Sequence, residues 1–162
     1  MSSGENDVAG VIARPPLILL CALAAGLIFD QLFPSSYIAQ TTPGLRYVSA
    51  AIALTAGLVF IGSAANEMRR VGTNIPTWEP TLEIATGGIY GRSRNPIYVG
   101  FMFLMVAFGL FFASDWTFVM IIPFALVIHY GVILREERYL LARFGADYAD
   151  YKTRVSRYLL GI

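Results

Sequence analysis

Long uncharged apolar runs alternate with short polar segments along the chain. Each run is close to the length of about 20 residues that a helix needs to cross the hydrocarbon core of a bilayer. The hydropathy pattern therefore predicts an all-α fold, an integral membrane bundle of four transmembrane helices. The predicted spans cover residues 16–33, 45–66, 96–114 and 116–134.

A very short break separates the third and fourth predicted spans. It consists of Ser114 and Asp115, and Asp is a favourable N-cap, so we expect Asp115 to cap the fourth helix. Two antiparallel helices that are joined this tightly place their other ends at the same membrane surface. Residues 94–98 and 135–140 should therefore lie close together.

The polar segments predict different local structures. Residues 1–13 are short and polar, and we expect them to be poorly ordered. Residues 67–94 contain two prolines that prevent a continuous helix, while their aromatic and aliphatic residues indicate that this connection docks on the bundle. After the fourth span, Gly145 interrupts the helical pattern, and Asp147 is expected to cap an amphipathic segment that reaches Tyr158. This segment is the predicted cytoplasmic C-terminal helical extension.

Small residues recur every four positions in the first two predicted spans. They are Ala22 and Gly26 in the first span, and Ser49, Ala53 and Gly57 in the second. Such stripes allow helix backbones to approach closely in membranes. We therefore interpret them as packing surfaces without a chemical role.

Composition assigns the whole chain, residues 1–162, to a single membrane domain. Charged residues make up 14% of the sequence, whereas soluble domains carry about 25%. The net charge of +1 provides no basic excess for nucleic-acid binding. One cysteine and one histidine are too few for a site built from these ligands, so no metal is predicted.

Basic residues are concentrated on one predicted side of the membrane. Ten of the 12 Lys and Arg residues lie in the connection 67–94 or after residue 134. Because positively charged loops stay on the cytoplasmic side, we expect this connection and both termini to face the cytoplasm. The expected location is a bacterial inner membrane, and the oligomeric state stays open.

Residues 87–98 combine turn-forming, basic and aromatic residues at the start of the third span. Asn95-Pro96 is typical of a helix entry, because Asn caps helices and Pro suits the first turn. Arg94 precedes the free backbone N–H groups of the new helix, where an anionic group of a ligand would be stabilised. The alternative is that Arg94 and the tyrosines of this block only anchor the helix at the membrane interface.

Two blocks of sequence resemble the signatures of one family. The blocks are Arg94-Asn95-Pro96-x-Tyr98, and Arg135-Glu136-Glu137-Arg138-Tyr139-Leu140 followed by Phe144-Gly145-x-x-Tyr148-x-x-Tyr151. They are similar to those of the isoprenylcysteine carboxyl methyltransferase and phospholipid N-methyltransferase superfamily, and the resemblance covers residues 72–158. It implies that cofactor motifs in residues 87–98 and 135–151 form a pocket for S-adenosylmethionine. The cofactor-binding residues expected on this basis are Tyr90, Arg94, Asn95, Pro96, Tyr98, Glu136, Glu137, Leu140 and Tyr148.

The residue types in these blocks suit this cofactor. Its carboxylate suits an arginine or free N–H groups, its amino group and ribose hydroxyls suit a carboxylate, and its sulfonium suits an aromatic face. Methyl transfer depends mainly on alignment of donor and acceptor, so the lack of an obvious nucleophile is compatible with it. Ile89 and Gly91 stand where relatives often have Pro and Arg, which leaves the shape of the entry loop open. The sequence has no glycine-rich loop after a strand, which excludes a Rossmann-type methyltransferase.

The predicted catalytic set consists of four residues: Arg94, His129, Glu136 and Glu137. His129 is the single histidine, and its spacing of seven from Glu136 would place both side chains on one helix face. It is either a base that accepts a proton from an amine or hydroxyl acceptor, or a histidine bonded to a neighbouring helix. The two glutamates are either functional or a solvated helix end paired with Arg135 and Arg138.

The resemblance implies S-adenosylmethionine-dependent methyl transfer to a lipophilic or membrane-embedded acceptor. The acceptor is a lipid or a lipophilic small molecule, and its reacting group is a carboxylate, amine, thiol or hydroxyl. Membrane lipids are the other expected partner. The alternative is a non-catalytic membrane scaffold or transporter subunit that retains the fold.

Overall fold

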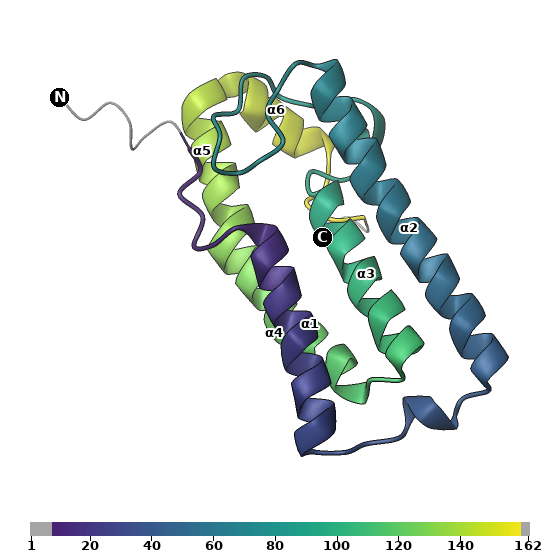
Figure 1. Cartoon of the computed structure of the whole chain (residues 1–162). Helices are drawn as coiled ribbons and strands as arrows, with labels where there is room; N and C mark the ends of the chain where they lie inside the picture. The colour runs from purple at the N-terminus through teal and green to yellow at the C-terminus, as the bar shows by residue number, and fades with distance from the viewer. Residues whose placement is uncertain (1–7, 160–162) are drawn as a thin grey trace.

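The computed structural model describes residues 8–159 as a helical chain without β-strands in that range (Figure 1). Residues 1–7 and 160–162 of the predicted single domain lie outside the described residues. A π-helical turn joins the fourth long helix directly to the fifth, and two short 3₁₀ turns lie in the connections. The elements are α1 (Pro15–Leu32), a 3₁₀ turn (Ile38–Gln40), α2 (Pro43–Arg70), a 3₁₀ turn (Gly88–Gly91), α3 (Pro96–Phe112), α4 (Asp115–Ile128), the π-helical turn (His129–Ile133), α5 (Leu134–Phe144) and α6 (Ala146–Arg154).

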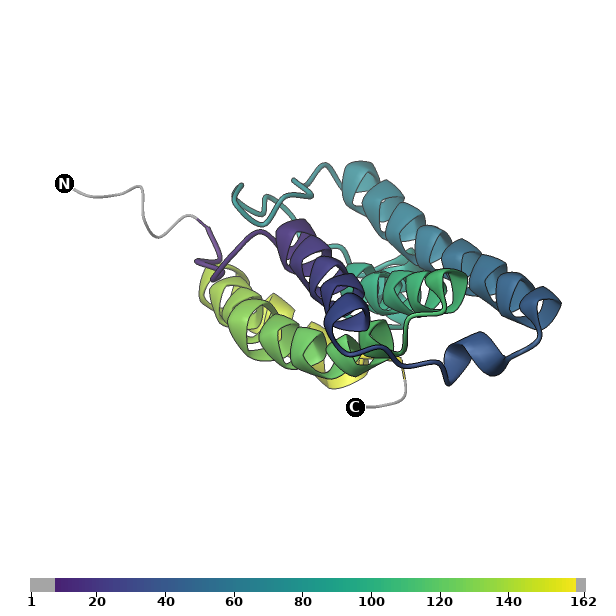
Figure 2. The ribbon, with the colours of Figure 1, turned by 60° about the horizontal axis from the view of Figure 1, so that its bottom comes forward.

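The long helices pack as two pairs (Figures 1 and 2). Helix α2 lies along α3, and α1 lies along α4, while further contacts join α3 to α4. The buried apolar core lies between α1, α3 and α4, and includes Leu23, Met105, Phe124 and Ile128. The tight turn between α3 and α4 makes these helices antiparallel, so the start of α3 and the end of α4 lie at the same end of the molecule, as predicted.

Glycines allow close approach within both helix pairs. A Cβ atom built on Gly57 of α2 would lie 3.0 Å from the carbonyl oxygen of Gly100 of α3, and the reverse distance is also 3.0 Å. In the other pair, a Cβ on Gly26 would lie 2.8 Å from the Cα of Thr117. Gly26, Gly57 and Ala53 are buried, which confirms the packing role predicted for them.

The helices are compatible with a membrane bundle. Helices α1 and α2 and the continuous helix Asp115–Phe144 are each long and apolar enough to cross a membrane, by length and composition. Helix α2 extends to Arg70, past the predicted end at residue 66. Helix α3 is apolar but has 17 residues, which span about 26 Å, slightly less than a hydrocarbon core of about 30 Å. The number of spans stays a prediction.

The start of α4 differs from the prediction in one detail. Ser114, rather than Asp115, is the N-cap, and its Oγ accepts a hydrogen bond from the backbone N–H of Thr117 at 2.9 Å. Asp115 instead accepts hydrogen bonds from the backbone N–H groups of Tyr37 and Ile38, both at 2.8 Å. Its carboxylate therefore holds the α1–α2 connection against the α3–α4 turn.

The last helix is shorter than predicted. Helix α6 ends at Arg154 rather than Tyr158, because the backbone of Val155 is extended, with φ −124° and ψ 130°. The following residues turn back towards the start of α3, where the backbone N–H of Arg94 donates to the carbonyl oxygen of Ser156 at 3.0 Å. Contacts with α3 thus replace the last helical turn.

The described part of the N-terminal segment is ordered, in contrast to the prediction for residues 8–13. The backbone N–H of Ile12 donates to the carbonyl oxygen of Gly131 at 3.2 Å, and Arg135 Nη1 donates to the carbonyl oxygen of Gly10 at 3.0 Å. The segment therefore docks on the π-helical turn. The part of that prediction that concerns residues 1–7 lies outside the described residues.

The Gly57–Gly100 contact predicts that Gly100→Leu lowers the thermal stability of the protein in detergent. A leucine would meet the Ile61 side chain and the Gly57 carbonyl oxygen, and overpacking of this kind costs about 1–3 kcal/mol. Gly62→Leu on α2 is a matched control, because nothing lies within 4 Å of a Cβ built there. Equal unfolding midpoints for the two variants would contradict the close approach of α2 and α3.

Candidate functional site

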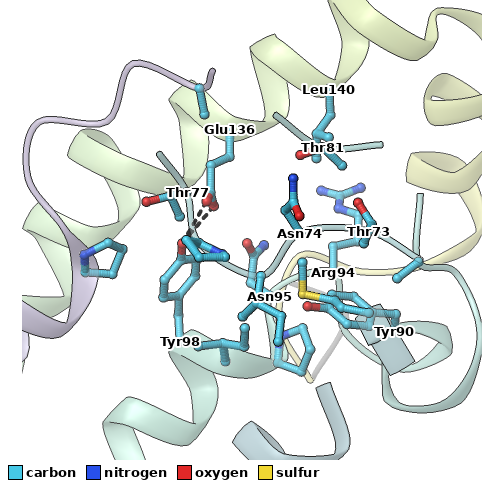
Figure 3. Close-up of a pocket in the computed structure, with 18 of the residues that line it drawn as sticks. Thr73, Asn74, Thr77, Thr81, Tyr90, Arg94, Asn95, Tyr98, Glu136 and Leu140 are labelled. Carbon is cyan, nitrogen blue, oxygen red and sulfur yellow. Dashed lines mark hydrogen bonds between the residues drawn. The ribbon is translucent and has the colours of Figure 1, made fainter. Parts of the chain in front are cut away.

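A cavity of about 410 Å³ lies where the start of α3, the end of α2 and helices α5 and α6 meet (Figure 3). The connection between α2 and α3 covers one side, and Ala9 of the N-terminal segment lines another together with Pro15 and Pro16 at the start of α1. Apolar side chains from the membrane helices, including Ile61 and Phe101, form part of the wall. The volume falls in the range of about 300–1,000 Å³ that is typical of small-molecule sites.

All nine residues predicted to bind the cofactor line this cavity. The α3–α4 hairpin and the return of α6 bring them together from three separate parts of the sequence. Three of the four predicted catalytic residues are among them, and His129 is not. The nine are Tyr90, Arg94, Asn95, Pro96, Tyr98, Glu136, Glu137, Leu140 and Tyr148.

His129 lies away from this wall, at the start of the π-helical turn. Its Nδ1 lies 2.8 Å from the hydroxyl oxygen of Tyr158, and its ring packs edge-on against Tyr130. A π-helical turn closes hydrogen bonds over five residues instead of four, so positions seven apart lose the common face of a regular α-helix. The spacing argument that placed His129 beside Glu136 therefore fails in this helix.

Glu136 places its carboxylate at the cavity, where it meets Tyr98 (Figure 3). The Tyr98 hydroxyl lies 2.9 Å from each oxygen of the carboxylate and donates to it. No Lys or Arg forms an ion pair with Glu136 in the described part of the chain. This carboxyl group is therefore held in place by a neutral donor and has no positive partner. Burial raises its pKa to about 7, so a positive charge on a bound ligand would favour its ionised form.

Glu137 has a different environment, although it is the next residue. One of its oxygens pairs with Arg94 Nη2 at 2.9 Å, and the other pairs with Arg157 Nη2 at 2.8 Å. The side chains of Glu137 and Arg94 are only 7% and 8% exposed. Two guanidinium groups against one carboxylate leave a net positive charge in this cluster, next to the carboxyl group of Glu136.

Two of the three guanidinium nitrogens of Arg94 donate hydrogen bonds within the protein. Besides its bond to Glu137, Nη1 donates to the carbonyl oxygen of Lys152 at 3.0 Å. Its Nε is buried and has no hydrogen-bond partner in the described structure. An unpaired buried donor is costly, so this atom is a point at which an acceptor group of a ligand would add stability.

The two neighbours of Arg94, Ser93 and Asn95, attach the C-terminal segment to the start of α3. Ser93 Oγ and Asn95 Nδ2 both donate to the carbonyl oxygen of Arg157, each at 3.2 Å. Asn95 occupies the predicted N-cap position of α3, but its side chain makes no capping hydrogen bond. The hydrogen bonds to Glu137 raise the pKa of Arg157 and keep it charged. Sequence patterns offer no pointer to Arg157 beyond the basic character of the tail.

The connection between α2 and α3 is folded over the cavity. The Thr73 hydroxyl accepts hydrogen bonds from the backbone N–H groups of Leu82 and Glu83, at 2.9 and 3.2 Å. The backbone N–H of Thr81 donates to the Tyr139 hydroxyl of α5 at 3.1 Å. The docking predicted for residues 67–94 is thus confirmed. The polar residues that it adds to the wall, among them Thr73, Asn74 and Thr77, follow no motif that sequence reasoning could use.

Gly87 and Gly88 let this connection pass close to the end of α2. A Cβ built on Gly87 would lie 2.5 Å from Glu67 Oε1, and Gly88 has a φ of +54°, which favours glycine. Glu67 itself pairs with Arg70 at 2.7 Å. Glycine at these two positions therefore allows the backbone to pass Glu67 and continue to Tyr90 and Arg94.

Tyrosines form the wall on the side of α6. Tyr148 and Tyr151 are buried, and the Tyr151 hydroxyl donates to the backbone carbonyl oxygen of Tyr90 at 2.7 Å. Burial raises the pKa of the Tyr90, Tyr148 and Tyr151 hydroxyls, so all three remain neutral hydrogen-bond donors. Such rings can stack on a heterocycle while their hydroxyls bond to polar groups.

Comparisons with known proteins match the part of the chain that forms the site. The phospholipid methyltransferase family model matches residues 45–147, from α2 into α6. An uncharacterized protein of Haemophilus influenzae is 35% identical over 63 residues, which cover 39% of this chain and the whole of that protein. No solved structure matches the chain at a significant level. The family model spans well over half of the sequence, and the chain belongs to the phospholipid methyltransferase family.

Proposed function

We propose that the protein transfers a methyl group from S-adenosylmethionine to a lipophilic acceptor in the membrane. Family membership supports methyl transfer as the general activity. The observation that carries the proposal is the charge arrangement of the cavity. The cluster of Arg94, Glu137 and Arg157 has a net positive charge, whereas the carboxyl group of Glu136 has no basic partner and would ionise most readily beside a positively charged ligand.

The residues present fit S-adenosylmethionine group by group. Its carboxylate matches the positive cluster, in which Arg94 Nε lacks a partner. Its positive centres match the unpaired carboxylate of Glu136. The neutral hydroxyls of Tyr90 and Tyr148 and their rings match the nucleoside part. When bound, the cofactor would supply an electrophilic methyl group.

The protein's own contribution is to position the two reactants and exclude water. Methyl transfer needs the donor and acceptor in line, and such alignment supplies a large part of the rate enhancement. The connection over the cavity separates it from solvent on one side, and α5 and α6 enclose it on another. Apolar residues such as Ile61 and Phe101 connect the cavity to the membrane helices and suit a lipophilic acceptor. We assign His129 a structural role, through its contact with Tyr158.

Calorimetric titration with S-adenosylhomocysteine tests the proposal directly. We expect the folded wild-type protein in detergent to bind it, and Glu136→Gln to weaken binding at least tenfold, because an interaction with a charged group is worth about 1.5–3 kcal/mol. Asp147→Asn on α6 removes the same charge from an exposed residue that does not line the cavity, so its affinity should stay unchanged. Lack of binding by the wild-type protein would favour the non-catalytic scaffold or transporter subunit.

The two adjacent glutamates should respond differently to mutation. The sequence treats Glu136 and Glu137 alike, but only Glu137 forms ion pairs, one with the buried Arg94 and one with the partly exposed Arg157. Removing one partner of a buried ion cluster costs about 3–5 kcal/mol, so Glu137→Gln should markedly lower the unfolding midpoint, whereas Glu136→Gln should not. Thermal unfolding of both variants in the same detergent measures this difference. A wild-type midpoint for Glu137→Gln would show that the ion cluster is not needed for stability.

We also propose that both termini face the cytoplasm and that four helices cross the membrane. Single cysteines at Gln40 and Thr153, two exposed positions, can be placed in a Cys21→Ser background and labelled with a membrane-impermeant maleimide in sealed vesicles. Three proposed spans lie between these positions, so the two cysteines should be labelled from opposite sides. Labelling of both from the same side would refute the topology.

A further inference from the structure

Asn74 is a polar side chain at the cavity that neither sequence motif contains. It lies on the connection between α2 and α3, two residues before Pro76, and its side chain lines the cavity. Its Nδ2 donates a hydrogen bond to the carbonyl oxygen of Pro80 at 3.0 Å. A carbonyl oxygen only accepts hydrogen bonds, so this contact fixes which end of the amide is the nitrogen.

The amide oxygen of Asn74 is left as an oriented acceptor. No described residue donates a hydrogen bond to it, and the side chain is only partly exposed. Figure 3 shows Asn74 in projection between Glu136 and Arg94, in the middle of the residues that line the cavity. The cavity thus contains a hydrogen-bond acceptor that is separate from Glu136 and from the Arg94 cluster and that receives no hydrogen bond from a described residue.

This acceptor is held by a preformed loop. The Thr73 hydroxyl binds the backbone N–H groups of Leu82 and Glu83, and the Tyr139 hydroxyl binds that of Thr81. The loop is therefore closed on itself and attached to α5 without a ligand. A side chain on such a loop loses little conformational freedom when it binds, which favours its use in recognition.

We propose that Asn74 binds the ammonium group of the cofactor's amino-acid part, which makes it a specificity-determining residue. This inference rests on the proposed function. The carboxylate and ammonium groups of an amino acid are attached to one carbon, so a carboxylate at the Arg94 cluster puts the ammonium group beside it. An ammonium group has three donors and no acceptor. Asn74 Oδ1 and the Glu136 carboxylate are suited to receive them.

The test compares two ligands that differ in the amino-acid part. S-adenosylhomocysteine carries the ammonium group, and 5′-methylthioadenosine lacks the whole amino-acid part. We expect Asn74→Ala to weaken the binding of S-adenosylhomocysteine about tenfold, the effect of losing one hydrogen bond to a charged group. The affinity for methylthioadenosine, measured by competition, should stay the same. Asn66→Ala is the control, because Asn66 is exposed on α2 and does not line the cavity.

The other outcomes separate a failure of the role of Asn74 from a failure of the proposed function. Unchanged affinity for S-adenosylhomocysteine in Asn74→Ala would overturn the role of Asn74 while leaving the proposed function intact. An equal loss for both ligands would also overturn it, since it would show that the variant disturbs the loop through the lost bond to Pro80. Failure of the wild-type protein to bind S-adenosylhomocysteine would instead refute the proposed function itself, and the inference with it.

Discussion

The largely buried ion cluster of Glu137 with Arg94 and Arg157 is the interaction on which the rest of the site depends. It joins three parts of the chain: the start of α3, the first turn of α5 and the segment after α6. Buried charges are unfavourable unless each is paired and hydrogen-bonded. The cluster therefore favours this arrangement of the three parts, because moving both guanidinium groups away would leave the buried Glu137 carboxylate without a partner.

The charge distribution of the cavity follows from this cluster. Because Glu137 is fully used by two guanidinium groups, the neighbouring Glu136 is left to face the cavity with only Tyr98 as its donor. Adjacent residues on a helix point about 100° apart, so one helical turn can serve both the protein core and the ligand. A positive region and an acidic group without a basic partner thus lie at one cavity, which suits a ligand with charges of both signs.

The sequence predicted the fold and much of the cavity wall because these depend on local signals. Apolar runs and the short Ser114-Asp115 break determine the hairpin, and the hairpin places Arg94 and Tyr98 at the same end of the molecule as Glu136 and Glu137. The different environments of the two glutamates could not be predicted, since they depend on Arg157, which is distant in sequence from the motif that it completes. The prediction that His129 lies beside Glu136 was wrong, because a π-helical turn changes the register of the helix. No pattern of residues in the sequence predicts such a turn.

The docking of the C-terminal segment relies largely on main-chain atoms. The carbonyl oxygens of Lys152, Ser156 and Arg157 accept the bonds from residues 93–95, and only the guanidinium of Arg157 contributes a side chain to the cluster. A main-chain carbonyl is present whatever residue occupies the position. The carbonyl contacts of Lys152 and Ser156 would therefore survive substitution at these positions as long as the backbone keeps its path, so a tail of different composition that retains Arg157 can complete the same cavity.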